Sequence, residues 1–220
     1  MRQFKSSIII AVSAVSAIVL AGCAVGPDVA EVQKLTQTFI AKGFKDNGQA
    51  TVSRITKADE TNRLCGEADA SGKPLDEATA KRIEQANMET IKWPANGNYI
   101  GDWKKGEEIA QSGRGMTWTD APNAVNGGNC YNCHQITQEE ISYGTIGPSL
   151  YNYGKTRGVT DPYDPKSAAI VQYTWGKIWN PKAYNACSNM PRGGHNGVIN
   201  EAQIRDIMAL LLDPKSPVNK

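Results

Sequence analysis

Two thiols and an imidazole lie within one short stretch near the middle of the 220-residue chain, as Cys130, Cys133 and His134. The thiols are three positions apart and the histidine follows the second thiol directly, which is the spacing of c-type haem attachment sequences. In such a sequence each cysteine sulfur can bond one vinyl group of the porphyrin, and the imidazole can bind the iron from one face. The stretch therefore predicts one covalently bound haem c.

The same residues could instead form a redox dithiol or half of a zinc site. A zinc site needs further cysteines or histidines at ligand spacing. Beyond the N-terminal segment, the remaining ones are Cys65, Cys187 and His195, which are scattered along the sequence. We therefore favour the haem interpretation.

The N-terminal segment has the features of an export signal. Residues 1–22 begin with a short basic region and continue with an apolar run that is too short for a comfortable transmembrane helix. Leu20-Ala21-Gly22-Cys23 resembles a bacterial lipobox, in which cleavage leaves a lipidated cysteine at the N-terminus. An ordinary signal peptide cut near Ala24 is the alternative. Both predict a periplasmic protein, and a lipid on Cys23 would anchor it to the membrane.

The composition is that of a soluble globular protein, with 40% hydrophobic and 21% charged residues. The formal net charge of +2 includes Arg2 and Lys5, so removal of the signal peptide would leave a neutral chain. The sequence has no basic run and no alternation of basic and aromatic residues, so no nucleic-acid partner is expected.

Export also permits disulfides. With Cys23, Cys130 and Cys133 set aside, Cys65 and Cys187 remain, and a bridge between these two is the simplest pairing. A free thiol and an intermolecular link are the alternatives. A bridge would tie the N-terminal part of the chain to the part that holds the haem motif.

Residues 23–97 are predicted to form a helical N-terminal extension. Apolar residues recur at rough helical spacing early in this range, and Asp59 to Arg63 suggests a short helix. Asp76 is a plausible N-cap of a further helix. One face of that helix would carry Ala80, Ile83, Ala86 and Ile91, and residues 94–97 would end it. The extension could be a strap on the domain surface or a docking element for a partner.

Residues 98–220 are predicted to form a second, all-α domain that carries the haem motif. Asp102 is expected to cap a helix that runs from about Trp103 to Ser112, and Asn200 with Gln203 forms a capping-box pattern before another helix. Two terminal helices that flank a haem motif resemble the class I cytochrome c fold. In that family the two helices cross at a small residue, which here would be Gly106.

The resemblance to cytochromes c continues after the motif, at Gly147-Pro148-Ser149-Leu150. In the family, the proline carbonyl of such a segment accepts the ring N–H of the proximal histidine and so orients the imidazole. The resemblance implies this role for Pro148 toward His134. An ordinary turn is the alternative, because Gly-Pro pairs are common turn markers.

A second axial ligand would make the iron a low-spin electron carrier. Asn189-Met190-Pro191 resembles the methionine-proline loop that supplies this ligand in class I cytochromes c, and a thioether raises the reduction potential. His195 and an open site are the alternatives to Met190. The aromatic residues between the motif and this loop, Tyr173, Trp175, Trp179 and Tyr184, are expected to wall the haem or face a partner.

Two longer segments, residues 141–154 and 179–192, and the tail from His195 to Pro214 resemble the SoxX family. The resemblance covers roughly residues 98–217, and Gly193-Gly194 departs from it, since a bulkier residue would be unsurprising there. SoxX is the monohaem subunit of the SoxAX cytochrome of bacterial sulfur oxidation.

Membership of this family would imply an electron-transfer subunit of an L-cysteine S-thiosulfotransferase. The SoxA-type haem partner would carry the catalytic cysteine, at which thiosulfate is joined oxidatively to a cysteine of the carrier SoxYZ. The haem of this chain would relay the electrons to a small soluble cytochrome c. No catalytic residue is expected here.

Two other functions are compatible with a haem motif. A free-standing periplasmic electron shuttle would be a monomer without a lasting partner. A haem enzyme or gas sensor would use His134 as its sole axial ligand, an interpretation that the methionine-proline loop disfavours. The thiosulfate chemistry depends on the family resemblance alone, because fold does not determine function.

Overall fold

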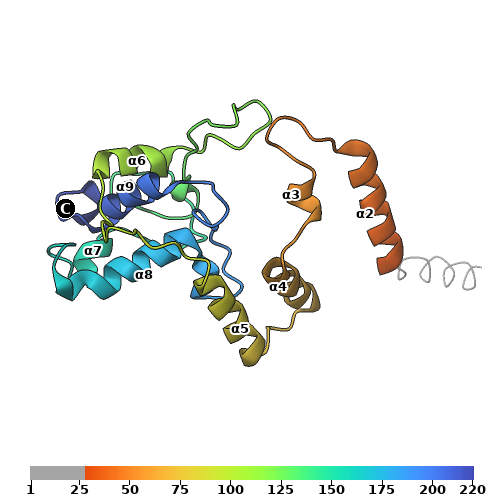
Figure 1. Cartoon of the computed structure of the whole chain (residues 1–220), viewed down its shortest axis with the longest axis horizontal. Helices are drawn as coiled ribbons and strands as arrows, with labels where there is room; N and C mark the ends of the chain where they lie inside the picture. The colour runs from red at the N-terminus through yellow and green to blue at the C-terminus, as the bar shows by residue number, and fades with distance from the viewer. Residues whose placement is uncertain (1–27) are drawn as a thin grey trace, which may run out of the picture. The chain divides into compact units, whose positions relative to one another are not determined.

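The computed structural model describes residues 28–220 and is helical throughout that range, apart from turns, loops and one isolated bridge between Asn47 and Ala50. The all-α prediction is confirmed (Figure 1). The α-helices are α2 (Val29–Gly43), α3 (Ser53–Thr56), α4 (Glu60–Ser71), α5 (Glu77–Met88), α6 (Trp103–Gln111), α7 (Tyr153–Thr156), α8 (Ala168–Trp179) and α9 (Glu201–Leu212). Single 3-10 turns are η1 (Cys130–Asn132), η2 (Pro165–Ser167), η3 (Pro181–Ala183) and η4 (Pro217–Asn219).

The chain divides into two compact units, one up to Asp46 and one from Asn47 to Lys220. The first contains α2, whose N-cap Asp28 accepts a hydrogen bond from the Ala30 N–H. The apolar stripe of α2, with Leu35 and Phe39, is exposed. The second unit contains residues 47–97 of the expected extension together with residues 98–220.

Helices α6 and α9 pack against each other in the second unit, as Figure 1 shows. Both begin as the sequence predicts: Asp102 accepts the Lys104 N–H, and Asn200 and Gln203 form a complete capping box. Gly106 is buried at the contact, where a Cβ atom would fall on the Asp206 carbonyl of α9. The close approach of the two backbones therefore requires a residue without a side chain.

The apolar face of α9 forms the centre of the core. Ile204, Ile207, Met208 and Leu211 are all buried, as their spacing predicts. Burying an aliphatic side chain of this size stabilises a fold by roughly 1.5–3 kcal/mol relative to leaving it in water. This face therefore supplies much of the apolar burial of the second unit.

Helix α8 is not among the helices that the sequence predicts. Its Trp175 and Trp179 are buried and stacked, with ring centroids 6.2 Å apart. Their indole N–H groups donate to the carbonyls of Lys92 (2.9 Å) and Thr90 (3.2 Å). Both tryptophans therefore join the core to the segment after α5, a role that the expected haem wall did not include.

The two extension helices of this unit differ in detail from the prediction. Helix α4 runs to Ser71, well past the expected end, and Asp59 and Asp76 cap α4 and α5. Helix α5 ends at Met88, and Ala86 is exposed, so its predicted place on the buried face is wrong. Asn87 is buried instead, because its amide donates to Thr61 of α4 (3.1 Å) and to the Ile83 carbonyl (2.8 Å).

Among the helices of residues 28–220, none combines the length and the apolar run that crossing a membrane requires.

Replacing Gly106 by alanine is expected to lower the free energy of unfolding by roughly 1–3 kcal/mol, because the new methyl group would collide with the α9 backbone. Gly66→Ala is the matched control, since Gly66 lies within α4 and no atom comes within 4 Å of its ideal Cβ position. The control should gain about 0.5–1 kcal/mol from the lost flexibility of glycine. Urea unfolding followed by circular dichroism measures both, and similar effects would contradict the close crossing.

Candidate functional site

The predicted haem motif forms the turn η1 and the two residues that follow it. The N–H groups of Cys133 and His134 both donate to the Cys130 carbonyl, at 3.1 and 3.0 Å. Asn129, which precedes the turn, has a left-handed backbone (φ 51°), which asparagine tolerates better than most residues. The turn thereby presents the two thiols and the imidazole from five consecutive residues.

Both thiols of the motif are unpaired and half-buried. Burial raises the pKa of the Cys130 thiol to about 11, so this group is protonated at neutral pH. Across residues 28–220, no three His, Cys, Asp or Glu side chains come together as ligands for a metal ion. Neither cysteine is engaged in a disulfide, so both are left for thioether attachment to a porphyrin.

The imidazole of His134 is oriented by the segment that contains Pro148. Its Nδ1–H donates to the Pro148 carbonyl at 2.7 Å. A carbonyl can only accept, so Nδ1 carries a proton. In the neutral imidazole the lone pair is then on Nε2, which is the nitrogen left for iron. A hydrogen bond of this kind orients an imidazole ligand and increases its basicity.

Backbone hydrogen bonds hold the Pro148 segment along the motif. The N–H groups of Gly144, Gly147 and Leu150 donate to the carbonyls of Tyr131, Cys133 and Gln135, at 2.7–2.8 Å. The three bonds follow the motif in register. The Pro148 carbonyl therefore cannot move away from the imidazole unless these neighbouring hydrogen bonds break.

Two glycines of this segment have roles that their sequence context does not predict. A Cβ atom on Gly147 would fall on the His134 ring, and one on Gly144 would fall on the Asn132 carbonyl. Their spacing, one at each end of the four residues that precede the proline, is the signal that could have identified them.

Apolar side chains on the loops beside the motif face water in this protein. Val125, Ile141 and Ile146 are exposed by 78%, 96% and 76%. Removing apolar surface of this kind from water is favourable. A porphyrin is largely apolar and could cover it. With two free thiols and an imidazole whose Nε2 is available, the residues fit a haem c, which when bound supplies a one-electron iron couple.

Met190 is half-buried and packs against the main core cluster. Its N–H donates to the Ser188 hydroxyl (3.3 Å), and the Ser188 N–H donates to the Asn185 carbonyl (3.0 Å), so the residue follows a tight turn. His195, the other candidate ligand, has its N–H bonded to the Trp179 carbonyl. Partial burial and the positive charge of Arg192 lower the pKa of His195.

Cys65 and Cys187 are joined by a disulfide, with their Cα atoms 5.4 Å apart. The structure therefore brings together the two cysteines that were expected to pair, and links α4 to the loop that contains Met190. Gly194, at the departure from the SoxX pattern, packs against Trp179, since a Cβ atom there would lie 2.6 Å from the indole ring. Cys23, the expected lipidation site, lies outside the described residues.

Gly147→Ala is expected to displace the His134 imidazole and to break its hydrogen bond to Pro148. The loss of a hydrogen bond to an iron ligand typically lowers metal affinity or activity by about 10–100-fold. The yield of haem-containing protein should fall, which haem staining measures. The reduction potential should rise, because a less basic imidazole stabilises ferric iron less, and potentiometric titration measures this. Gly66→Ala serves again as the control, and a Gly147→Ala protein with an unchanged potential would contradict the account.

Comparison with known proteins agrees with this geometry. Residues 117–214 match the family model of cytochrome c. A protein of Aquifex aeolicus (strain VF5), named an uncharacterized lipoprotein, is 40% identical over 132 residues, which are 60% of this chain and 59% of that relative. The chain thus spans less than two thirds of the relative's length. Residues 117–214 of this all-α chain are therefore similar to cytochrome c, a family whose domains bind haem c covalently and use it for electron transfer.

Proposed function

We propose that this chain is the monohaem electron-transfer subunit of a SoxAX-type complex in the periplasm. The observation that carries the electron-transfer role is the hydrogen bond between His134 and Pro148, which prepares one axial ligand of the iron. The SoxAX assignment depends on the resemblance of residues 141–154 and 179–192 to SoxX. One attachment motif implies one haem.

The chemistry would be shared between chains. In the proposed reaction, a carrier thiol of SoxYZ and thiosulfate form a sulfur–sulfur bond and release one proton and two electrons. No oxygen is added, so the electrons must leave through haem. A single haem accepts one electron at a time, so this chain would pass them on in two steps to a small soluble cytochrome c.

The cysteines of this chain support a partner-borne catalytic thiol. Cys130 and Cys133 are assigned to haem attachment, and Cys65 and Cys187 are bonded to each other. These are all the cysteines of residues 28–220, so none in the described part of the chain is left as a nucleophile. We place the catalytic cysteine on the SoxA-type subunit.

Met190 is our proposed second axial ligand. Its loop position after the motif and its burial against the core support this assignment. A methionine thioether opposite a histidine raises the reduction potential of a haem. A haem of higher potential is a better acceptor for the electrons that the conjugation of thiosulfate releases.

We further propose that a lipid on Cys23 anchors the complex to the membrane. The name of the Aquifex aeolicus relative, a lipoprotein, supports this placement, and so does the lipobox-like sequence at residues 20–23. The chain would then act at the membrane surface while its haem domain remained in the periplasm.

Purification from the native periplasm or membrane, followed by haem staining, tests the SoxAX assignment. We expect a second haem-bearing chain in equal amount, and reduction of the haem of this chain when thiosulfate is added with SoxYZ. Omission of SoxYZ should abolish the reduction, because the carrier thiol is a substrate. A chain that purifies alone and shows a low-spin spectrum would instead be an electron shuttle.

A further inference from the structure

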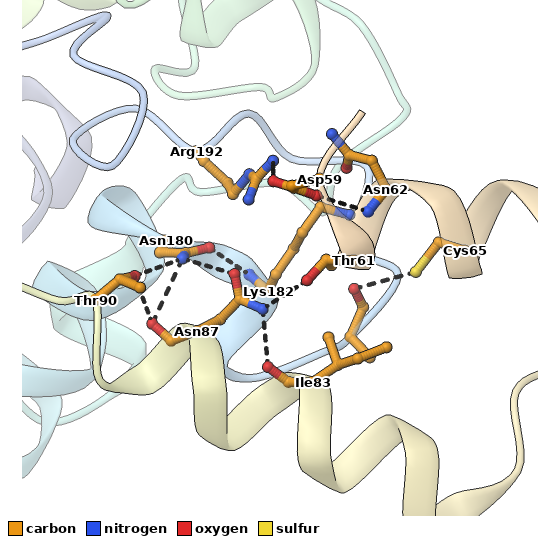
Figure 2. Close-up of polar contacts among 11 residues, drawn as sticks. Asp59, Thr61, Asn62, Cys65, Ile83, Asn87, Thr90, Asn180, Lys182 and Arg192 are labelled. Carbon is orange, nitrogen blue, oxygen red and sulfur yellow. Dashed lines mark hydrogen bonds and ion pairs between the residues drawn. The ribbon is translucent and has the colours of Figure 1, made fainter. Parts of the chain in front are cut away.

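The loop that contains Met190 has no regular secondary structure between η3 and α9. Such loops are usually among the more mobile parts of a protein. A thioether ligand on this loop nevertheless needs a well-defined position, so the groups that hold the loop determine whether the ligand is available. In this structure several of those groups belong to the N-terminal extension (Figure 2).

On the N-terminal side of Met190, the loop is tied to the extension covalently. The disulfide joins Cys187, three residues before Met190, to Cys65 in α4. The Ala186 N–H donates to the Glu84 carboxylate of α5 at 3.2 Å. Two consecutive loop residues are thus held by two different helices of the extension.

On the C-terminal side of Met190, the tie is ionic. Arg192, whose side chain is only 7% exposed, pairs with the Asp59 carboxylate at 2.5 Å, as Figure 2 shows. Asp59 also caps α4 by accepting the Asn62 N–H at 2.8 Å. Burial alone would raise the pKa of Asp59, but the Asn62 N–H and Arg192 outweigh it and lower the pKa. The carboxylate is therefore ionised at neutral pH.

Buried amides fix the same helices to the start of the loop. The Asn180 side-chain amide donates to Asn87 Oδ1 and to the Thr90 hydroxyl, both at 2.9 Å (Figure 2). Asn180 is fully buried, and buried polar groups of this kind are costly to separate. The extension thus contacts the loop at its base and on both sides of Met190.

We propose that α4 acts as a clamp on the Met190 loop, and that Asp59 and Cys65 are positioning residues for the sixth ligand of the iron. This inference deepens the proposed function, because it rests on Met190 being that ligand. The residues of the clamp do not bind the iron. They would position Met190 by holding residues 186–192 of the loop in place.

Asp59→Asn is the sharpest test, because asparagine caps a helix as well as aspartate but cannot pair with a guanidinium ion. In the haem-loaded full chain, we expect amide hydrogen exchange in residues 186–195 to accelerate roughly tenfold, from the loss of one charge-assisted hydrogen bond. The far-red absorption band of a ferric iron–thioether bond should weaken at lower temperature than in the wild type.

Asp76→Asn is the matched control, since Asp76 caps α5 in the same way, through the Thr79 N–H at 2.9 Å. It should change neither the exchange of residues 186–195 nor the far-red band. The Cys65→Ser/Cys187→Ser double variant should accelerate exchange in the same residues. Unchanged exchange in both clamp variants, or an equal effect of Asp76→Asn, would overturn the clamp.

Two methionine variants separate a failure of the clamp from a failure of its premise. Met190→Leu should abolish the far-red band, and Met208→Leu, at a buried core position, should keep it. If the wild type lacks the band, or Met190→Leu retains it, Met190 is not the ligand. The clamp is then wrong as well, because it presupposes that ligand. If the band requires Met190 but the clamp variants exchange like the wild type, the ligand stands and the clamp is wrong.

Discussion

The hydrogen bond from His134 Nδ1–H to the Pro148 carbonyl is the contact on which the haem site depends. It determines the tautomer of the imidazole, and so which nitrogen is left for iron. It also fixes the distance between two loops that have no regular structure of their own. The other features of the site serve this contact: backbone bonds hold the Pro148 segment in register, and Gly147 leaves room for the ring.

Helices α6 and α9 belong to the core that lies next to the loops of this contact. The two helices cross closely at Gly106 and form part of the packed core. The extension then adds a second set of contacts that hold the C-terminal part of the chain. The Thr90 and Lys92 carbonyls of the extension accept the indole N–H groups of the two α8 tryptophans, and Asp59 pairs with Arg192 of the Met190 loop. The haem motif and the Pro148 segment are thus organised by local sequence, and the Met190 loop by distant contacts.

The parts that the sequence predicts correctly are those with local signals. Asp76, Asp102 and Asn200 cap the helices expected of them, because a cap needs only its own helix. The spacing of Cys130, Cys133 and His134 is also a local signal, and their role in binding haem stays a prediction. Assignment of Met190 and Cys23 still depends on sequence.

The parts that the sequence did not predict depend on partners far along the chain. Asn87 is buried in place of Ala86 because Thr61 and Asn180 satisfy its amide. Helix α8 mixes aromatic and small residues on several faces, which hides its helical period. The pair Asp59–Arg192 joins residues 133 positions apart, and nothing in either local sequence indicates it.

The central claim is that this chain binds one haem c through Cys130 and Cys133. The most direct test is the intact mass of the denatured protein after acid–organic extraction, which removes haem that is not covalently bound. The account predicts the mass of the chain plus one haem, and the loss of that increment in a Cys130→Ala/Cys133→Ala variant. A wild-type chain that loses its haem on extraction, or retains it without the two cysteines, would contradict the account.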